Sequence, residues 1–437
     1  MKTKPLQILL LAFALLVTYS SMAQSTGAFA FSNGADVSWL PQMETSGYKF
    51  YDVDGTAKDC LQLLKDRGIN TIRLRVWVNP STDIKNGHCS PAETVVMAVR
   101  AQNLGMRIMI DFHYSDTWAD PGHQAKPAAW ATHTFAQLQD DVYNHTYAVL
   151  NLLKTAGVTP EWVQVGNEIP GGMLFPDGSN TGNNFVKLTQ LLNKGYDATK
   201  AISTAIKVII HIDQGNDNAR SRWFYDGLKA QSIKYDVIGL SYYPYWLGSN
   251  SHPDYTTSIV ALGNNLKDMV SRYGKEVMIV EVGGDYTLVQ NTKDMLTATI
   301  NAVKAVPNNK GLGVVYWEPE GAKSWSGYQL SAWLSNGKPS AALDAFLVQL
   351  GLDDKGSVAK VLVYPNPVSS ILNVKNSGNT EITALKITNI LGQTVFSNAN
   401  ASAKSQNTID VSNWNAGIYI LSIATGEAVQ QFKFCKK

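Results

Sequence analysis

The chain has 437 residues, of which 45% are hydrophobic and 16% are charged. This length and this apolar fraction are enough for a large buried core and for more than one domain. The formal net charge is only +2, without a basic stripe or an acidic tail, which gives no indication of a nucleic-acid partner or of an anionic membrane. The 11 tryptophans and 19 tyrosines favour a protein that stacks rings on neutral, flat ligands, although many of them will fill the core.

The first 23 residues have the composition of an export signal. Lys2 and Lys4 give a positively charged start, and residues 6–17 form a short apolar run. The small-x-small pattern at residues 21–23 is typical of a cleavage site before Gln24. The run is shorter than the ~20 residues that a membrane-spanning helix needs. We therefore expect a secreted or cell-surface protein whose mature form has no membrane span.

Short apolar segments alternate eight times with amphipathic stretches between residues 31 and 350. The apolar segments are rich in valine, isoleucine and leucine, as parallel strands covered on both faces are, and they lie at 31–37, 71–77, 107–113, 161–168, 207–213, 237–243, 276–282 and 313–318. The predicted helices include 55–67, 91–104, 136–155, 185–203, 258–273 and 292–306. Eight such units predict an α/β fold, a closed (β/α)8 TIM barrel. An open doubly wound sheet is the alternative, but no glycine-rich phosphate loop follows the first predicted strand.

The character of the sequence changes after residue 353. A polar linker at 354–357 is followed by short β-type segments with proline and glycine turn signals between them, at 360–364, 371–375, 384–390, 394–397 and 418–424. This pattern predicts a small all-β sandwich. We therefore divide the chain into a signal peptide, a barrel domain, a linker and a β-sandwich domain, at residues 1–23, 24–352, 353–360 and 361–437.

Polar side chains gather at the carboxyl ends of the predicted barrel strands, where TIM barrels place their reacting groups. Glu168 ends the fourth predicted strand, Glu281 ends the seventh, and Asn167 directly precedes Glu168. These two strands lie roughly across a barrel, so the two carboxyls can converge over its centre. Glycoside hydrolysis with retention needs two carboxyls about 5–5.5 Å apart, one protonated and one ionised. The pattern predicts Glu168 as the acid/base, Glu281 as the nucleophile, and Asn167 as a partner of the sugar 2-hydroxyl.

Neighbouring charges are expected to separate the pKa values of the two glutamates. An ionised Glu281 raises the pKa of Glu168, while Arg73 keeps Glu281 charged. Arg73 and Arg75 alternate with apolar residues and so share one face of their strand. The alternative for both arginines is an ion pair with Asp36 at the bottom of the barrel.

Aromatic residues at or just past the strand ends are candidates for stacking on sugar rings. They are Trp77, Trp118, Trp246 and Trp317. Packing in the core is the alternative for each of them. His113, at the end of the third predicted strand, is either a substrate-binding residue or an ordinary hydrogen-bonded core histidine.

No metal ion or other cofactor is expected. The spacing of His113, Asp116, Asp120 and His123 matches no defined ligand pattern, and a mechanism with two glutamates needs no metal. The chain has only 3 cysteines, too few for a disulfide scaffold. A single bridge between Cys60 and Cys89 is left open.

Long stretches of the barrel segment resemble the arabinogalactan endo-β-1,4-galactanases of glycoside hydrolase family 53. The resemblance spans about residues 30–350 and is carried by GADVSWLPQMETSGYKFYDVDG, GINTIRLRVWVNP, DFHYSDTWADPGHQAKPAAW, VQVGNEIPGGMLFPDG, DVIGLSYYPYW, IVEVGG and VVYWEP. It implies a retaining enzyme on galactan, with the glutamate of VGNE, Glu168, as acid/base and Glu281 as nucleophile. The wider clan of such barrels implies that further residues shape the −1 subsite, namely Arg73, His113, Asn167, Tyr243 and Trp317.

Two features depart from the resemblance. The EVGG context of Glu281 lacks the threonine and the aromatic turn of many relatives, which puts the contacts around the nucleophile in doubt. Some bacterial relatives bind calcium after the eighth strand, whereas residues 318–340 here contain a single acidic residue beyond Glu318, Glu320. Calcium is therefore not expected.

The last segment resembles the C-terminal sorting domains of type IX secretion cargo. The stretches that carry this resemblance are VYPNPVSSILNV, ITNILGQTVF and AGIYILSIATGE. It implies export to the periplasm, passage through the outer membrane, and removal of the tail. A carbohydrate-binding sandwich is the alternative, but Trp414 is the only tryptophan of the tail, and a sugar-stacking platform usually needs more aromatic residues.

Three hypotheses for the whole protein remain at this point. The first is a secreted endo-β-1,4-galactanase that acts on the galactan side chains of pectin. The second is a related retaining barrel enzyme on mannan, xylan or cellulose, which would share the two glutamates. The third is a binding protein without activity on the same scaffold, against which the presence of both Glu168 and Glu281 argues.

Overall fold

The computed structural model describes residues 31–83, 88–247, 254–347, 361–376, 382–389, 392–399, 406–425 and 428–437. The predicted signal peptide, at 1–23, and the predicted linker, at 353–360, lie outside these ranges. None of the helices within them is long and apolar enough to cross a bilayer.

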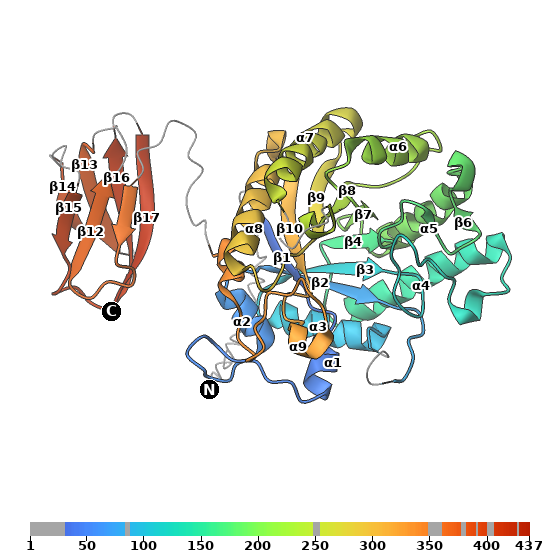
Figure 1. The fold of residues 1–437 in the computed structure, drawn as a ribbon, viewed down its shortest axis with the longest axis horizontal. Coiled ribbons are helices and arrows are strands. Elements are labelled where there is room, and N and C mark those ends of the chain that lie inside the picture. Colours follow the sequence, from blue (N-terminus) through green and yellow to red (C-terminus); the bar gives the residue numbers. More distant parts are fainter. Residues whose placement is uncertain are drawn as a thin grey trace, which may run out of the picture. The chain divides into compact units, whose positions relative to one another are not determined.

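Eight parallel strands form a closed barrel in the first part of the chain, as predicted (Figure 1). They are β1 (Ser32–Asp36), β2 (Thr71–Val76), β3 (Arg107–Phe112), β4 (Trp162–Val165), β7 (Lys207–Ile212), β8 (Val237–Tyr242), β9 (Glu276–Val282) and β10 (Gly311–Trp317). Each strand pairs with its neighbours in the chain order of the barrel, and β10 closes the ring on β1. All eight strands fall on the segments predicted from their apolar residues.

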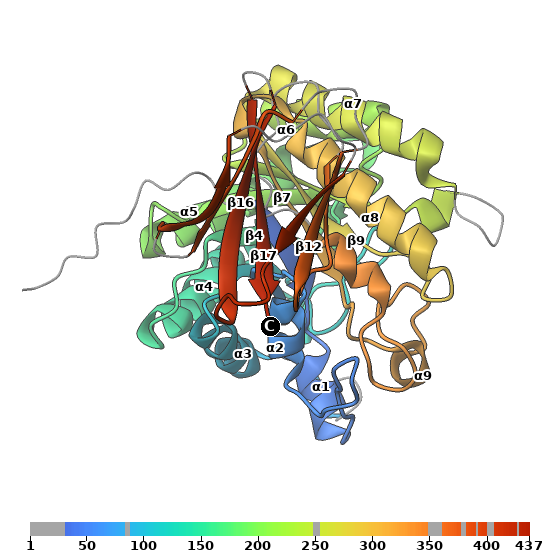
Figure 2. The same cartoon turned by 90° about the vertical axis from the view of Figure 1, so that its left-hand side faces the viewer.

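Helices surround the strands, and each covers the outer face of the barrel with its apolar side (Figures 1 and 2). They are α2 (Cys60–Asp66), α3 (Pro91–Asn103), α4 (Phe135–Thr155), α5 (Val186–Ile202), α6 (Asn218–Lys229), α7 (Tyr255–Tyr273) and α8 (Val289–Lys304). Shorter elements lie in the loops, namely α1 (Leu40–Thr45), α9 (Lys323–Ser326), β5 (Gly172–Met173) and β6 (Gly178–Ser179). Helix α6 is absent from the predicted segments, although Ser221, Phe224, Tyr225 and Leu228 bury one helical face.

Several predicted boundaries differ from the structure by a few residues, and two of the differences have a clear local cause. The helix predicted at 55–67 begins only at Cys60, because the Asp59 side chain accepts a hydrogen bond from the Gln62 amide and caps the helix there. The strand predicted at 161–168 ends at Val165. Gly166 and Glu168 have φ angles of 84° and 42°, which an extended strand does not allow.

The amino-terminal half of the barrel interior is an apolar core. It consists of Met109, Trp162, Ile209, Val237, Met278, Val280, Leu312 and Val315. Cys60 and Cys89 are both buried free thiols, so the bridge left open between them does not form. With this end filled, the space for a ligand lies at the carboxyl ends of the strands.

The last part of the chain folds as two antiparallel sheets, as predicted, and its strands are drawn in red in Figure 2. One sheet contains β11 (Val361–Tyr364), β12 (Ile371–Asn376) and β15 (Gln406–Asp410), and the other contains β13 (Ala384–Asn389), β14 (Thr394–Asn398), β16 (Gly417–Thr425) and β17 (Ala428–Lys436). Leu372 and Ile409 of the first sheet share one buried cluster with Ile387 and Leu421 of the second. This part therefore has a core of its own.

Candidate active site

Arg73 is the centre of a buried polar network at the carboxyl end of the barrel. Its Nη1 donates to Asp36 Oδ2 at 2.7 Å, and its Nη2 lies 2.9 Å from Asp111 Oδ2 and 2.9 Å from Glu281 Oε1. All three acids are buried and come from different strands. One guanidinium therefore compensates several carboxylates, and removal of the arginine would leave buried charges unpaired. The ion pair with Asp36 exists, but it lies at the end that carries the glutamates and not at the barrel bottom.

Glu281 is held by a cation and a hydroxyl. Besides the contact to Arg73, its Oε2 accepts a hydrogen bond from the Tyr243 hydroxyl at 3.1 Å. Burial raises the pKa of Glu281 to about 7, although Arg73 acts to lower it. Arg73 and Tyr243 stabilise the carboxylate, so the pKa of Glu281 is lower than that of an equally buried carboxyl without such partners.

Glu168 lies in a different environment. Its Oε1 accepts a hydrogen bond from Ser241 Oγ at 2.6 Å, and Ser241 Oγ lies 2.8 Å from His211 Nε2. His211 Nδ1 accepts a hydrogen bond from the Glu168 amide and also lies near the side chains of Gln164 and Asn167. With Nδ1 as the acceptor, the proton of a neutral His211 is on Nε2, which faces Ser241. No cation is in hydrogen-bond contact with Glu168 among the described residues, which favours its protonated form.

The two glutamates face the same opening of the barrel. Ser241, which bonds Glu168, is the strand partner of Glu281 in the β8–β9 pairing. Tyr243, which bonds Glu281, lines the same cavity as Glu168. The pKa of Glu168 is raised well above its ordinary value, first by burial and second by the charge of Glu281. Only the charge of Glu281 was expected from the sequence to raise this pKa, and burial is the larger cause.

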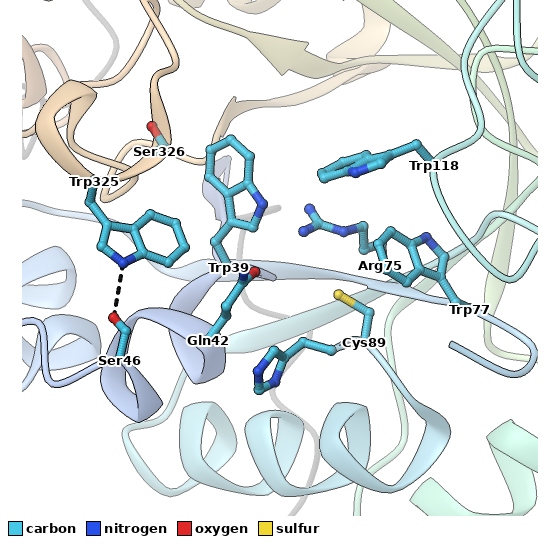
Figure 3. Close-up of a pocket in the computed structure, with 10 residues that line it drawn as sticks. Trp39, Gln42, Ser46, Arg75, Trp77, Cys89, Trp118, Trp325 and Ser326 are labelled. Carbon is cyan, nitrogen blue, oxygen red and sulfur yellow. Dashed lines mark hydrogen bonds between the residues drawn. The ribbon is translucent and has the colours of Figure 1, made fainter. Parts of the chain in front are cut away.

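A cavity of about 660 Å³ at the carboxyl end of the barrel has the rings of Trp39, Trp77, Trp118 and Trp325 in its lining. Figure 3 shows its walls, with the Arg75 guanidinium beside the Trp118 ring and pointing toward Trp39. The guanidinium carbon lies 4.1 Å from the Trp118 ring centroid, a cation–π contact. Trp325 closes another side and donates its indole N–H to Ser46 at 2.9 Å.

A second cavity, of about 330 Å³, adjoins Glu168. Trp246 is the largest side chain in its lining and is 65% exposed. Asp213 also lines this cavity, and Arg220 holds it by two hydrogen bonds of 2.9 and 3.0 Å. The two cavities thus differ in aromatic content, and only the smaller one contains Glu168 in its lining.

The other predicted site residues lie between or beside these cavities. Trp317 contacts Trp39 and Trp118, with ring centroids 5.1 and 5.9 Å apart. Trp77 lines the larger cavity but is only 3% exposed, and its indole donates to His113 Nδ1 at 3.2 Å. Trp77 therefore packs in the core and also presents an edge to the cavity, so both alternatives given for it hold in part.

His113 and Asn167 are already engaged in hydrogen bonds. His113 Nδ1 also accepts from the Ala119 amide, and Nε2 lies 3.0 Å from Asp111 Oδ2. Asn167 Oδ1 accepts from Arg73 at 2.9 Å, and Nδ2 donates to the Ala119 carbonyl at 2.8 Å. The ring nitrogens of His113 are thus both used, whereas the Asn167 amide retains a second N–H for a ligand. The roles of both residues toward a sugar stay predictions.

Several residues of the site were not selected from the sequence. Asp111, Gln164, His211 and Ser241 contact the reacting groups or their partners but are absent from the predicted site residues. Their signal was present, because each is a polar residue within an otherwise apolar strand. Among the residues that the structure describes, no group of three or more histidine, cysteine, aspartate or glutamate side chains is arranged to hold a metal ion.

A closed parallel barrel with two glutamates in different surroundings, Glu281 near the end of β9 and Glu168 just past the end of β4, has the construction of a glycoside hydrolase. Residues 32–348 match the family described as glycosyl hydrolase family 53. The chain belongs to this family.

Curated relatives agree with this assignment. The chain is 35% identical over 336 residues to a probable arabinogalactan endo-β-1,4-galactanase A of Neosartorya fischeri, with 71% of this chain and 89% of that protein covered. It is 33% identical over 314 residues to an endo-β-1,4-galactanase of Bacillus subtilis, with coverage of 66% and 70%.

A solved structure and the tail complete the comparison. The family 53 catalytic domain of Ignisphaera aggregans superposes with a TM-score of 0.66 at 30% identity, covering 74% of this chain and 97% of that one. Residues 362–437 match a secretion system C-terminal sorting domain. The protein is therefore a glycoside hydrolase with a tail that directs it out of the cell or to its surface.

Proposed function

We propose that the protein is an endo-β-1,4-galactanase that cleaves galactan and type I arabinogalactan side chains of pectin with retention of the anomeric configuration. Relatives at 33–35% identity carry the galactanase name, and the galactan substrate fits the family. The observation that carries the mechanism is the unequal surroundings of Glu281, which contacts Arg73 and Tyr243, and Glu168, which contacts Ser241.

The proposed mechanism follows from these surroundings. Glu281 attacks the anomeric carbon as a carboxylate, while Glu168 gives its proton to the leaving glycosidic oxygen. Water then attacks the glycosyl–enzyme ester, and Glu168, now ionised, takes a proton from it. Arg73 and Tyr243 stay bonded to the Glu281 carboxyl and orient it, and no metal or other cofactor takes part in these steps.

The position of Glu168 sets the direction of the bound chain. Since the acid faces the leaving oxygen, the cavity that contains Glu168 and Trp246 receives the leaving-group side. The larger cavity, with Trp39, Trp118 and Trp325, then receives the sugars that stay attached to Glu281. Tryptophan rings suit this role because they stack on the apolar faces of neutral sugars.

The substrate is tested with purified protein on linear β-1,4-galactan, mannan, xylan and a soluble cellulose. We expect reducing-sugar release from galactan at least ~10²-fold faster than from the other three polymers, because the axial O4 of galactose curves the chain and the tryptophan floor is built for one curvature. Proton NMR of the first products should show the β anomer. Equal rates on mannan, or first products with the α anomer, would contradict the proposal.

We further propose that the tail, residues 361–437, is a type IX secretion signal. The signal peptide at 1–23 first directs export to the periplasm, and the tail then directs passage through the outer membrane. The sorting-domain match supports this, and the division into residues 24–352, 353–360 and 361–437 remains part of the proposal. In a host with this secretion system, a chain that ends at residue 352 should accumulate in the periplasm, while the full chain reaches the surface or the medium. Equal export of both forms would refute the sorting role.

A further inference from the structure

Two acidic side chains follow β10 and are completely buried. Glu318 accepts hydrogen bonds from Arg75 Nη1 and, at 3.1 Å, from the Trp39 amide. Glu320 has no solvent exposure either. Neither of its carboxyl oxygens receives a hydrogen bond from any donor among the described residues, and its partner is the carboxyl group of Glu318.

Two adjacent carboxyls that both lack a proton offer only acceptors to each other. Among the described residues, Arg75 is the cation in contact with the pair, whereas Arg73 contacts Asp36, Asp111 and Glu281. Asp36 and Cys60, which also face the pair, add no positive charge. Burial, and then the charge of Glu318, raise the pKa of Glu320 well above its ordinary value. One proton on Glu320 removes the repulsion and gives one of its two carboxyl oxygens a hydrogen-bond partner, a Glu318 oxygen that accepts from it.

We propose that Glu320 is a positioning residue of the tryptophan-lined cavity, a neutral carboxylic acid that donates its proton in a hydrogen bond to Glu318 and so fixes the carboxylate that holds Arg75 and Trp39. Glu320 itself lies behind the cavity wall and outside its lining. It acts through Glu318, and the pair carries the single negative charge that Arg75 requires.

The wall depends on what Glu318 holds. Arg75 stacks against Trp118 and points toward Trp39 in Figure 3. Trp39 in turn contacts Trp118, Trp317 and Trp325, with ring centroids 6.0, 5.1 and 6.1 Å away. The turn after Glu318 also touches Trp39 directly, because a Cβ at Gly321 would lie 2.6 Å from its ring. The segment from Glu318 to Gly321 thus fixes the position of the Trp39 ring, which the other tryptophan rings contact.

The functional test rests on the proposed function, since it assumes that this cavity binds sugars beyond the bond that is cleaved. Glu320→Ala removes the donor, whereas Glu320→Gln keeps one in the same place. We expect Glu320→Ala to raise KM for long galacto-oligosaccharides about fivefold or more with kcat nearly unchanged, as loss of binding that is equal in ground and transition states does. Glu320→Gln should restore KM to within about twofold of the wild type.

Glu276→Gln is the matched control, because it makes the same carboxyl-to-amide change at the first residue of β9, in an ion pair with Lys207 at the amino-terminal end of the barrel. It should leave KM unaltered. If Glu320→Ala leaves KM unchanged, or if Glu320→Gln raises it as much as the alanine does, the positioning role is wrong.

A measurement without substrate separates this proposal from the proposed function. Infrared difference spectra of the wild type against Glu320→Gln, at pH 7 in H2O and D2O, should show a protonated-carboxyl band in the wild type alone. Glu168→Gln serves as a reference, because it removes a different protonated carboxyl. Absence of the Glu320 band would contradict the proposal that Glu320 is protonated and donates to Glu318. Its presence in an enzyme that does not cleave galactan would contradict the proposed function and leave the carboxyl pair intact.

Discussion

Glu281→Ala is expected to lower kcat on galactan by roughly 10⁴-fold or more, because loss of a nucleophile that works together with its partners removes most of their joint effect. The glycosyl–enzyme ester then has no carboxylate on which to form. Arg73 and Tyr243 keep their positions but point at an empty space. The rate is measured as reducing-sugar release under substrate saturation, so that a change in binding does not enter.

Azide provides the sharper form of this test. In Glu281→Ala it can enter the space of the missing carboxylate and attack the anomeric carbon of an activated aryl β-galactoside, which expels the phenol. The product should be the α-galactosyl azide, with inverted configuration. Glu276→Ala, at the amino end of the same strand, is the control and should keep its activity. A Glu281→Ala enzyme with wild-type rates would refute the assignment.

Glu168→Ala is expected to lower kcat/KM on galactan by roughly 10²- to 10⁴-fold, the usual contribution of a general acid. The loss should be much smaller on an aryl galactoside whose phenolate leaves without protonation. With that substrate the second step becomes limiting, because no base activates the water, and a burst of phenol is expected. Stopped-flow absorbance measures the burst. A loss of equal size on both substrates would indicate that Glu168 does not donate the proton.

The pH dependence gives an independent check on the same pair. Glu281 must be ionised, and its pKa is raised to about 7 by burial against the effect of Arg73, so kcat/KM should fall as the pH decreases below about 7. Glu168 must be protonated, and burial and the charge of Glu281 place its pKa well above the ordinary value, so the rate should fall again on the alkaline side of the optimum as Glu168 loses its proton. Glu168→Ala should abolish the alkaline limb and keep the acid limb. An unchanged profile in this variant would contradict the assignment.

The barrel was accessible from the sequence because its strands are rich in valine, isoleucine and leucine. Runs such as 237–240 and 277–280 have apolar side chains on both faces, as parallel strands between a core and a layer of helices do. The two glutamates were also accessible, because a charged residue directly after such a strand has to lie at one rim of the barrel. Family resemblance, and not the pattern itself, narrowed the substrate to galactan.

The surroundings of the glutamates were less accessible. Ser241 lies opposite Glu281 because the pairing of β8 with β9 shifts between Leu240 and Ser241, and no local sequence signal predicts such a shift. Arg73 was assigned either to Glu281 or to Asp36, whereas the closed ring brings both of these acids and Asp111 to it. Glu320 was considered only as a calcium ligand, because burial of two acids behind one arginine cannot be deduced from spacing.

The unequal aromatic content of the two cavities bears on how the enzyme would turn over. On the proposed direction of the chain, the half that carries the new reducing end would rest among Trp39, Trp118 and Trp325, while the departing half would contact a single indole, that of Trp246. Departure of the first half is therefore the slower of the two, and short oligosaccharides that settle among the three indoles compete with fresh polymer. Galactan degradation by this protein should slow as its own fragments accumulate.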